Sequence, residues 1–289
     1  MRRRPWRGWD DLAPMQDLLA RSLRDARATT FLHPGDLAWW VGWPPQTPDE
    51  LAARVTVVED GGAIVGWHYL DREDANECVD PAAPDPGAVW RELDAALEAH
   101  PAHARSVRED DAAGVARLRA AGFTPMREGM IGFSIDLRAL APLDPDDRVR
   151  PVELGDDLRP RASVTRAAFR VDRPFDRYVS EYEAFTRSPA YPEGWDLVAW
   201  AEPGVAAACT IAWPDRVSRV GNFEPVAAHP DLQRRGFASA VVRDGLRRLC
   251  DAGMERAVVY TVIDNHGAIA LYRSLGFRDD HIQRWFARS

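Results

Sequence analysis

The residues best suited to chemistry lie in one short turn in the second half of the chain. Gln233-Arg234-Arg235-Gly236 comes directly before an amphipathic run that begins at Phe237. Glycine lets the backbone come close to a ligand, and the first turn of a helix presents unpaired N–H groups at the positive end of its dipole. Two arginines add full charges that can pair with phosphate oxygens. The turn is therefore predicted to bind phosphate groups.

Regular elements are predicted on both sides of this turn. The preceding segment, 219–228, is predicted to be a strand, and the apolar residues of 241–250 recur on a single helical face. The Val/Ile-rich segment 257–263 is apolar enough to be a buried strand. A second helix is predicted to follow it, to begin near Asn265 and to carry Tyr272. The turn thus belongs to a strand–turn–helix unit.

These two patterns resemble those of the GNAT superfamily of acyltransferases. The turn matches its acetyl-CoA motif, Q/R-x-x-G-x-G/A, and the later residues match its Asn…Ala…Leu-Tyr…Gly-Phe pattern, as Asn265, Ala268, Leu271-Tyr272 and Gly276-Phe277. The resemblance implies an acyltransferase with acetyl-CoA as cosubstrate and no metal. It implies that an acetyl group passes to a primary amine of a small molecule, by direct attack through a tetrahedral intermediate.

The resemblance also implies which residues hold the coenzyme. The predicted strand 219–228 would pair with the pantetheine arm through its C-terminal end, and the N–H groups of the turn would hold the pyrophosphate. A main-chain N–H near Ala227 or Ala228 would face the thioester oxygen. Asn265 would hydrogen-bond the coenzyme arm, with helix capping as its alternative role. The coenzyme-binding residues implied are Val226, Ala227, Ala228, Gln233, Arg234, Arg235, Gly236, Phe237, Ala238, Ser239 and Asn265.

Acyl transfer to an amine needs a neutral amine and a proton for the departing thiolate. Glu224 is the candidate base, because it lies on the coenzyme strand and the residue before a proline is held extended. Tyr272 is the candidate acid: the family's tyrosine lies near the coenzyme sulfur, and a phenol of pKa about 10 can protonate a thiolate. A salt-bridged glutamate and a packing tyrosine are the alternatives. Pro225 has no N–H, which predicts a bulge or an unpaired edge beside the site.

The first half of the chain repeats the order of the second half. Pro81 and Gly87 match Pro230 and Gly236 at one offset, and Gly122-Phe123 matches Gly276-Phe277 at a second. We therefore predict an α/β (α+β mixed sheet) fold with two tandem GNAT-like domains, each a central twisted, mostly antiparallel sheet flanked by helices. The predicted bounds are 1–140 for the first domain, 141–147 for a Pro- and Asp-rich linker and 148–289 for the catalytic domain.

The first copy of the turn is predicted to lack an acyl-CoA site. Its sequence is Pro84-Asp85-Pro86-Gly87, in which each proline removes an N–H donor and the aspartate opposes a bound phosphate. Seven of the eleven tryptophans precede residue 91, so this half has a different composition and a different role. Whether Trp39, Trp40 or Trp43 lines a substrate pocket or only packs in the core stays open.

Composition narrows the classes of partner. The net charge of −8 disfavours nucleic acid and is compatible with a cationic amine acceptor. No apolar run reaches the length of about 20 residues that spans a bilayer, and no apolar signal core follows the basic N-terminus, so no membrane partner and a cytoplasmic location are expected. A monomer or a homodimer is expected. The three cysteines show no metal-ligand spacing.

Two further readings remain open from the sequence. The tandem architecture with a degenerate first copy also resembles mycothiol synthase, and the motifs do not distinguish that activity from acetylation of another small amine. A non-catalytic acyl-CoA-binding sensor is the alternative from a different class. The retention of Glu224, Tyr272 and the intact turn favours an enzyme.

Overall fold

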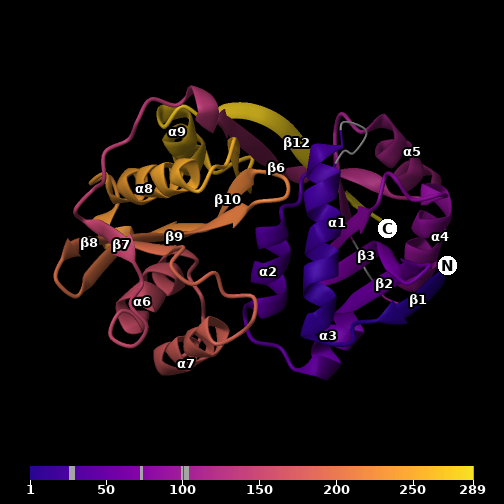
Figure 1. Ribbon diagram of the computed structural model, residues 1–289, viewed down its shortest axis with the longest axis horizontal. Helices are drawn as coiled ribbons and strands as arrows, with labels where there is room; N and C mark the ends of the chain where they lie inside the picture. Colours follow the sequence, from indigo (N-terminus) through magenta and orange to yellow (C-terminus); the bar gives the residue numbers. More distant parts are fainter. Residues whose placement is uncertain (26–29, 72–73, 99, 101–103, 289) are drawn as a thin grey trace.

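The computed structural model describes residues 1–25, 30–71, 74–98, 100 and 104–288. Within these residues, twelve strands form one sheet in the order β1-β2-β3-β4-β5-β12-β6-β11-β10-β9-β8-β7. Neighbouring strands run antiparallel except in the pairs β4–β5 and β10–β11. Helices cover the sheet in both halves (Figure 1). The predicted mixed α/β fold with a mostly antiparallel sheet is confirmed.

The two halves contain their helices and strands in the same order, except that the first half has one more helix, α3, before its second strand. The first half consists of β1 (Arg2–Pro5), α1 (Leu12–Arg24), α2 (Pro34–Gly42), α3 (Pro48–Arg54), β2 (Val55–Asp60), β3 (Ala63–Asp71), β4 (Asp74–Val79), α4 (Pro86–Leu97), β5 (Ala104–Arg108), α5 (Ala112–Ala120) and β6 (Thr124–Asp136). The second half consists of β7 (Val149–Pro151), α6 (Leu158–Ala168), α7 (Phe175–Thr186), β8 (Asp196–Glu202), β9 (Val205–Asp215), β10 (Val220–Ala228), α8 (Phe237–Asp251), β11 (Arg256–Val262), α9 (His266–Ser274) and β12 (Arg278–Ala287).

An equivalent arginine–aspartate ion pair lies at the start of each half, and it is buried in the first half and partly exposed in the second. Arg4 binds Asp11 in the first half, with both Nη–carboxylate distances 2.7 Å, and Arg150 binds Asp157 in the second. In each half the same aspartate also accepts a backbone N–H, from Arg7 or from Glu153. The same repeat is visible in the sequence, where R-P-x-x-x-x-D-D-L begins at residue 4 and again at residue 150. The repeat therefore extends to the first residues of each half.

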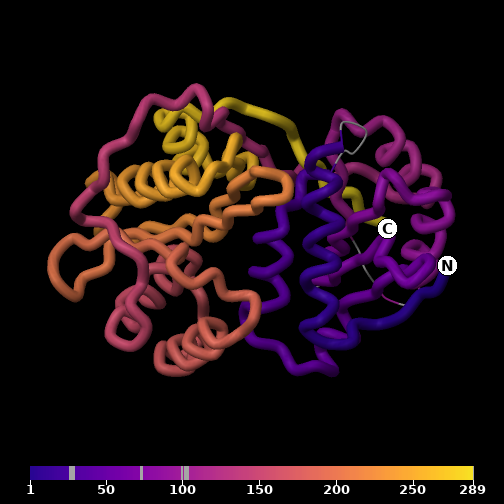
Figure 2. Tube along the Cα trace, in the orientation of Figure 1, coloured from indigo at the N-terminus to yellow at the C-terminus, as the bar shows by residue number. Residues whose placement is uncertain are grey.

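The last strand of each half joins the other half. β6 pairs along β11, from Asp136 opposite Arg256 to Met130 opposite Val262. β12 lies between β5 and β6, so both its neighbours belong to the first half. Figure 2 shows the C-terminal segment crossing from the second half to the first. The pairing thus crosses the predicted linker, whose bounds stay a prediction.

Splitting the chain at this linker should separate strands that need each other. Residues 148–289 alone would lack β6, which leaves the edge of β11 and both edges of β12 unpaired. We expect this fragment to aggregate by itself and to become soluble when co-expressed with residues 1–147. Size-exclusion chromatography of the two preparations measures the difference. A monodisperse, cooperatively unfolding fragment on its own would contradict the expectation.

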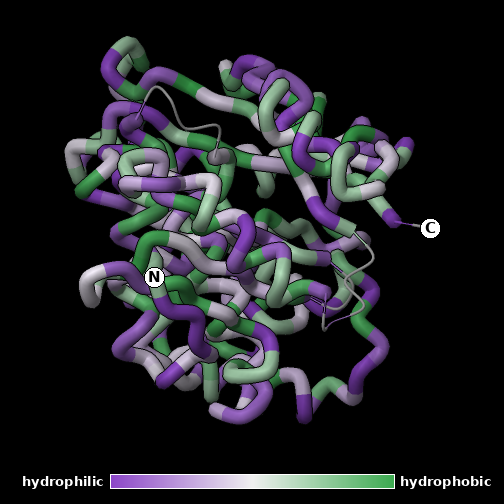
Figure 3. Tube along the Cα trace, turned by 90° about the vertical axis from the view of Figure 1, so that its right-hand side faces the viewer, coloured by the Kyte–Doolittle hydropathy of each residue, from purple (hydrophilic) through white to green (hydrophobic). Residues whose placement is uncertain are grey.

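The halves also share one hydrophobic core. Side chains of α1, α2 and β3 form a single buried cluster with those of α7 and β9. Trp39 and Trp43 stack with ring centroids 5.8 Å apart, and Trp43 meets Tyr182 of α7 at 5.4 Å. Trp40 stacks on Tyr69. Trp39 and Trp43 therefore pack the halves together, whereas Trp40 stacks within the first half. In Figure 3, hydrophobic and hydrophilic stretches alternate along the trace, as amphipathic elements require.

Candidate functional site

The predicted phosphate-binding turn connects β10 to α8. Gly236 has φ 85° and Arg234 has φ 64°, so both adopt the left-handed conformation that reverses the chain here. The Ala240 N–H donates to Gly236 O at 2.9 Å, which makes it the first helical bond. The N–H groups of Phe237, Ala238 and Ser239 precede that bond, and no side chain caps the helix. The turn therefore presents free backbone donors.

The side chains of the turn leave those donors accessible. Gln233, Arg234 and Arg235 are exposed, and neither arginine has a carboxylate partner among the residues that the structure describes. Phe237, Ala238 and Ser239 are partly buried at the start of the helix. Free guanidinium groups next to uncapped helical N–H groups form an arrangement that suits an anion such as pyrophosphate.

In the corresponding turn of the first half, an aspartate carboxylate already occupies the start of the helix. Asp85 caps α4, and its Oδ1 accepts the Ala88 N–H at 2.8 Å. Pro86 occupies the first position of that helix and has no N–H to offer. A phosphate here would have to displace the carboxylate. The geometry supports the prediction that this half lacks an acyl-CoA site.

Replacement of Gly236 by valine should weaken coenzyme binding. A β-branched residue is strained at φ 85°, at a cost of roughly 1–2 kcal/mol, although the space beside Gly236 is open. We expect the Gly236→Val variant to stay folded and to bind acetyl-CoA about tenfold more weakly, measured by isothermal titration calorimetry. Gly204→Val, at the φ 80° turn between β8 and β9, is the matched control. Equal affinity in the wild type and Gly236→Val would contradict the assignment.

Strand β10 is interrupted where Pro225 predicted a break. The pairing with β9 shifts register between Phe223 and Val226. On its other side, β10 pairs with β11 only from Val220 to Asn222, and no pairing continues beyond that point. The Trp213 Nε1–H holds the irregular segment by donating to Glu224 O at 2.7 Å. The prediction of a bulge or an unpaired edge at Pro225 is confirmed.

Beyond the bulge, backbone groups face the side from which β11 has separated. His229 N donates to Ala207 O of β9 at 2.8 Å. Backbone N–H groups alternate in direction along an antiparallel pair. The N–H of Ala227 therefore also points toward β9, whereas those of Val226 and Ala228 point to the opposite edge of the strand. The N–H groups of Val226 and Ala228 are therefore the ones available to a ligand lying along this strand.

Glu224 lies at the point where β10 and β11 separate. Its side chain is partly buried, and none of the described residues donates a hydrogen bond to its carboxylate. Burial raises the pKa of Glu224 to about 8, and the charge of Asp36 adds to the rise. A carboxylate whose proton affinity is raised and whose oxygens are unpaired is suited to accept a proton.

The neighbour of Glu224 comes from the other half of the chain. Asp36 lies in the first turn of α2, and its side chain accepts the Asn222 amide of β10 at 2.5 Å and the His33 N–H at 2.8 Å. Burial raises the pKa of Asp36 to about 7, against both hydrogen bonds. Its partner Asn222 is fixed by its place on β10, two residues before Glu224. No sequence motif marks Asp36, and it is not among the residues predicted from the sequence.

Tyr272 lies on α9, on the other side of the separation. It is 3 % exposed and packs against Phe133 and Phe277, with ring centroids 5.6 and 6.0 Å away. Burial raises the pKa of Tyr272, and the charge of Glu224 raises it further. The structure therefore brings Glu224 and Tyr272 close enough to interact electrostatically. The phenol stays protonated at neutral pH.

Asn265 is already engaged in local structure. Its Oδ1 accepts the Ala268 N–H at 3.2 Å and caps α9, and its Nδ2 donates to Thr261 Oγ1 at 3.1 Å. The first half shows the same cap, where Asp111 accepts the Gly114 N–H at 2.9 Å. The helix-capping alternative is thus the role that the contacts display, and a coenzyme contact of Asn265 stays a prediction.

Comparison with known proteins agrees with this geometry. Residues 164–277 match the acetyltransferase (GNAT) family and form a domain of that family. The match includes β10, the turn, α8, β11 and α9. The recognition of a GNAT domain from the sequence is confirmed.

The similar curated proteins are mycothiol acetyltransferases. That of Nocardiopsis dassonvillei is 31 % identical over 139 residues, which are 45 % of this chain and 42 % of that protein. That of Kocuria rhizophila is 28 % identical over 151 residues, or 47 % of each chain. That of Saccharomonospora viridis is 43 % identical over 58 residues, 20 % of this chain and 19 % of that protein. The chain spans about half the length, or less, of these relatives.

Solved structures share the fold of the whole chain. A tandem GNAT protein from the clavulanic acid biosynthesis pathway has a TM-score of 0.62 at 16 % identity and covers 99 % of this chain and 97 % of its own. The GCN5-related N-acetyltransferase of Sphaerobacter thermophilus has a TM-score of 0.58 at 18 % identity, with coverages of 99 % and 94 %. The tandem GNAT-like fold is therefore confirmed along the entire length.

No helix among the described residues is both long and apolar enough to cross a membrane. In the same part of the chain, no group of three or more His, Cys, Asp or Glu side chains is arranged to hold a metal ion.

Proposed function

We propose that the chain is an acetyl-CoA-dependent N-acetyltransferase that acetylates a primary amine of a small molecule. One observation carries the proposal: where β10 leaves β11, Glu224 is close enough to both Asp36 and Tyr272 to interact with them electrostatically, next to a turn with free N–H groups. The turn binds the pyrophosphate of the coenzyme. Val226 and Ala228 offer the N–H groups that pair with the pantetheine arm and polarise the thioester carbonyl.

Glu224 acts as the general base. The attacking amine must lose a proton, and a carboxylate with a pKa of about 8 matches the basicity that this step needs near neutral pH. Asp36 places a second acidic group beside it. Two acidic groups favour an acceptor that arrives as a cationic ammonium, because the charge of the amine offsets their mutual repulsion.

Tyr272 acts as the general acid. Its raised pKa keeps the proton on the phenol until a thiolate forms nearby. The phenol is held by the rings of Phe133 and Phe277, so it needs little reorganisation to donate. Glu224 takes one proton from the ammonium, so that the neutral amine can attack the thioester carbon. As the C–S bond breaks, Tyr272 gives its proton to the coenzyme sulfur and regains one from the nitrogen of the tetrahedral intermediate. Glu224 then releases its proton to solvent.

A mycothiol acetyltransferase activity is the second candidate. It is favoured by the similarity to mycothiol acetyltransferases over parts of the chain. It differs from the first proposal only in the acceptor, since the same base, acid and turn would serve both.

Release of free thiol from acetyl-CoA in the presence of an amine panel tests the proposal. The panel contains polyamines, aminoglycosides, aromatic amines and the mycothiol precursor amine. We expect amine-dependent release with at least one cationic acceptor and an acetylated product in mass spectrometry. Tight coenzyme binding without turnover on any acceptor would favour a sensor and overturn the proposal.

A further inference from the structure

A second feature lies away from the coenzyme turn, in a cavity of about 760 Å³ where the two halves meet. Its walls come from the end of α1 in the first half and from the ends of β6, β10, β11 and β12. Five arginines line the cavity, against one aspartate and one glutamate. The lining therefore has more positive than negative side chains, although the net charge of the whole chain is −8.

Both acidic groups are already neutralised. Asp136 binds Arg138 and Glu255 binds Arg219. Three arginines are left without a carboxylate partner among the described residues: Arg24, Arg256 and Arg278. Within the described ranges, Arg24 donates only to a backbone carbonyl, that of Val217 at 3.1 Å.

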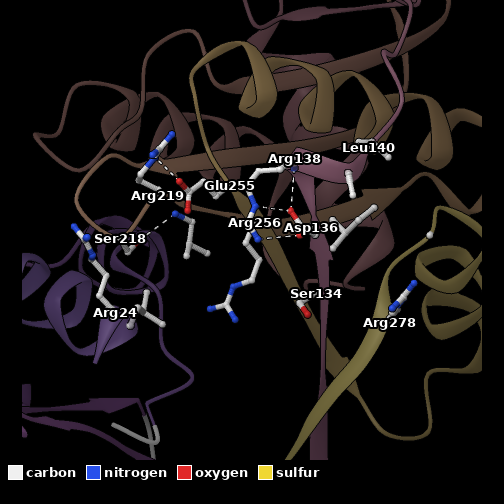
Figure 4. Close-up of a pocket in the computed structure, with 15 residues that line it drawn as sticks. Arg24, Ser134, Asp136, Arg138, Leu140, Ser218, Arg219, Glu255, Arg256 and Arg278 are labelled. Atoms are coloured by element: carbon white, nitrogen blue, oxygen red, sulfur yellow. Dashed lines mark hydrogen bonds and ion pairs between the residues drawn. The ribbon is translucent and has the colours of Figure 1, made fainter. Parts of the chain in front are cut away.

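Arg256 occupies the centre of this group. The alternation of β11 places Ala257 and Val259 in the core under α8, which sends Arg256 and Tyr260 to the opposite face, where Tyr260 bonds Phe31 O. Figure 4 shows the Arg256 guanidinium extending into the open space between Arg24 and Arg278. Its Nε is buried and has no hydrogen-bond partner among the described residues.

This arrangement is costly in the absence of a ligand. Three like charges around one cavity repel one another, and a buried donor without an acceptor loses its hydration. Carboxylates and phosphates relieve both costs, because a guanidinium binds either of them through two parallel hydrogen bonds. A cavity of this size admits an organic anion larger than a single phosphate.

We propose that this cavity is a binding site for a small polyvalent anion, one that carries at least two phosphate or carboxylate groups. Arg256 holds the anion at the centre, and Arg24 and Arg278 bind it from the first and the second half. Because the ligand connects α1 to the strands of the second half, its binding stabilises the packing of the halves. The site is distinct from the turn at Arg234 and does not depend on the proposed acetyl transfer.

Calorimetry with pyrophosphate and with citrate, at constant ionic strength and with coenzyme A present in excess to occupy the turn at Arg234, tests the proposal in the full chain. We expect saturable binding of at least one of the two, with a rise in melting temperature, and affinity reduced at least about tenfold in Arg256→Gln. Arg278→Gln, an exposed position, should also weaken binding and serves if Arg256→Gln does not fold. The two anions separate a phosphate ligand from a carboxylate ligand.

Two control variants test whether the anion binds in this cavity or elsewhere on the protein. Arg119→Gln removes an exposed arginine of α5 and should bind as the wild type does. Arg234→Gln alters the coenzyme turn and should also keep its affinity for the anion. The proposal is overturned if neither anion binds saturably up to about 10 mM, if Arg256→Gln and Arg278→Gln bind as the wild type does, or if only Arg234→Gln loses binding.

Discussion

Replacing Glu224 by glutamine should lower kcat by about 10²- to 10⁴-fold, the range expected for the loss of a general base. The amide has the shape of the carboxyl group but accepts no proton at neutral pH. Because no described residue donates a hydrogen bond to the Glu224 side chain, the change should leave the melting temperature nearly unaltered. Steady-state kinetics with saturating acetyl-CoA measure the effect.

The pH profile distinguishes a base from a structural residue. A base of pKa about 8 must be ionised to act, so kcat/KM should rise with pH up to about 8 and level off above it. The Glu224→Gln variant should not show this rise of kcat/KM with pH. The Asp36→Asn variant should show the rise at lower pH, because the charge of Asp36 helps to raise the pKa of Glu224. Glu202→Gln, an exposed carboxylate at the end of β8, is the control. An unchanged profile in Glu224→Gln would exclude Glu224 as the base.

Replacing Tyr272 by phenylalanine should lower kcat by about 10²-fold, while the dissociation constant of acetyl-CoA stays within about twofold of the wild type. The ring keeps its contacts with Phe133 and Phe277, so only the proton donor is lost. The substitution should matter most for acetyl donors with a poorly acidic thiol, since these need the proton most.

A buried tyrosine away from the site provides the control for this change. Tyr178 on α7 donates to Thr165 Oγ1 at 3.1 Å and lies in the core shared by the halves. Tyr178→Phe should reduce stability without affecting kcat in the folded fraction. A Tyr272→Phe enzyme with unchanged kcat would show that Tyr272 only packs.

Much of the site was predictable because its residues lie close together in the sequence. The turn, its glycine and the first N–H groups of α8 form one continuous segment, so local chemistry indicated their role. Pro225 predicted the break in β10 because a residue without an N–H interrupts a ladder. The internal repeat also appeared in the helix caps, where Asp111 and Asn265 perform the same function.

The remaining features depend on contacts between distant parts of the chain. The hydrophobic pattern of residues 278–287 identifies a strand but not its neighbours, so the exchange of β6 and β12 could not be predicted. Asp36 meets Asn222 across 186 residues, and a lone aspartate after a Pro-Gly pair looks like any helix start. The repeated R-P-x-x-x-x-D-D-L segment, by contrast, was visible in the sequence and would have extended the repeat to both N-terminal strands.

The number of acetyl-CoA molecules bound per chain tests the central claim most directly. We propose a single coenzyme site, at the turn of the second half, since of the two corresponding turns only this one has arginines and free N–H groups. Isothermal titration of the full chain with acetyl-CoA should give one molecule per chain, with the affinity reduced in Gly236→Val and unchanged in Asp85→Asn. Two molecules per chain, or one whose affinity depends on Asp85 and not on Gly236, would contradict the account.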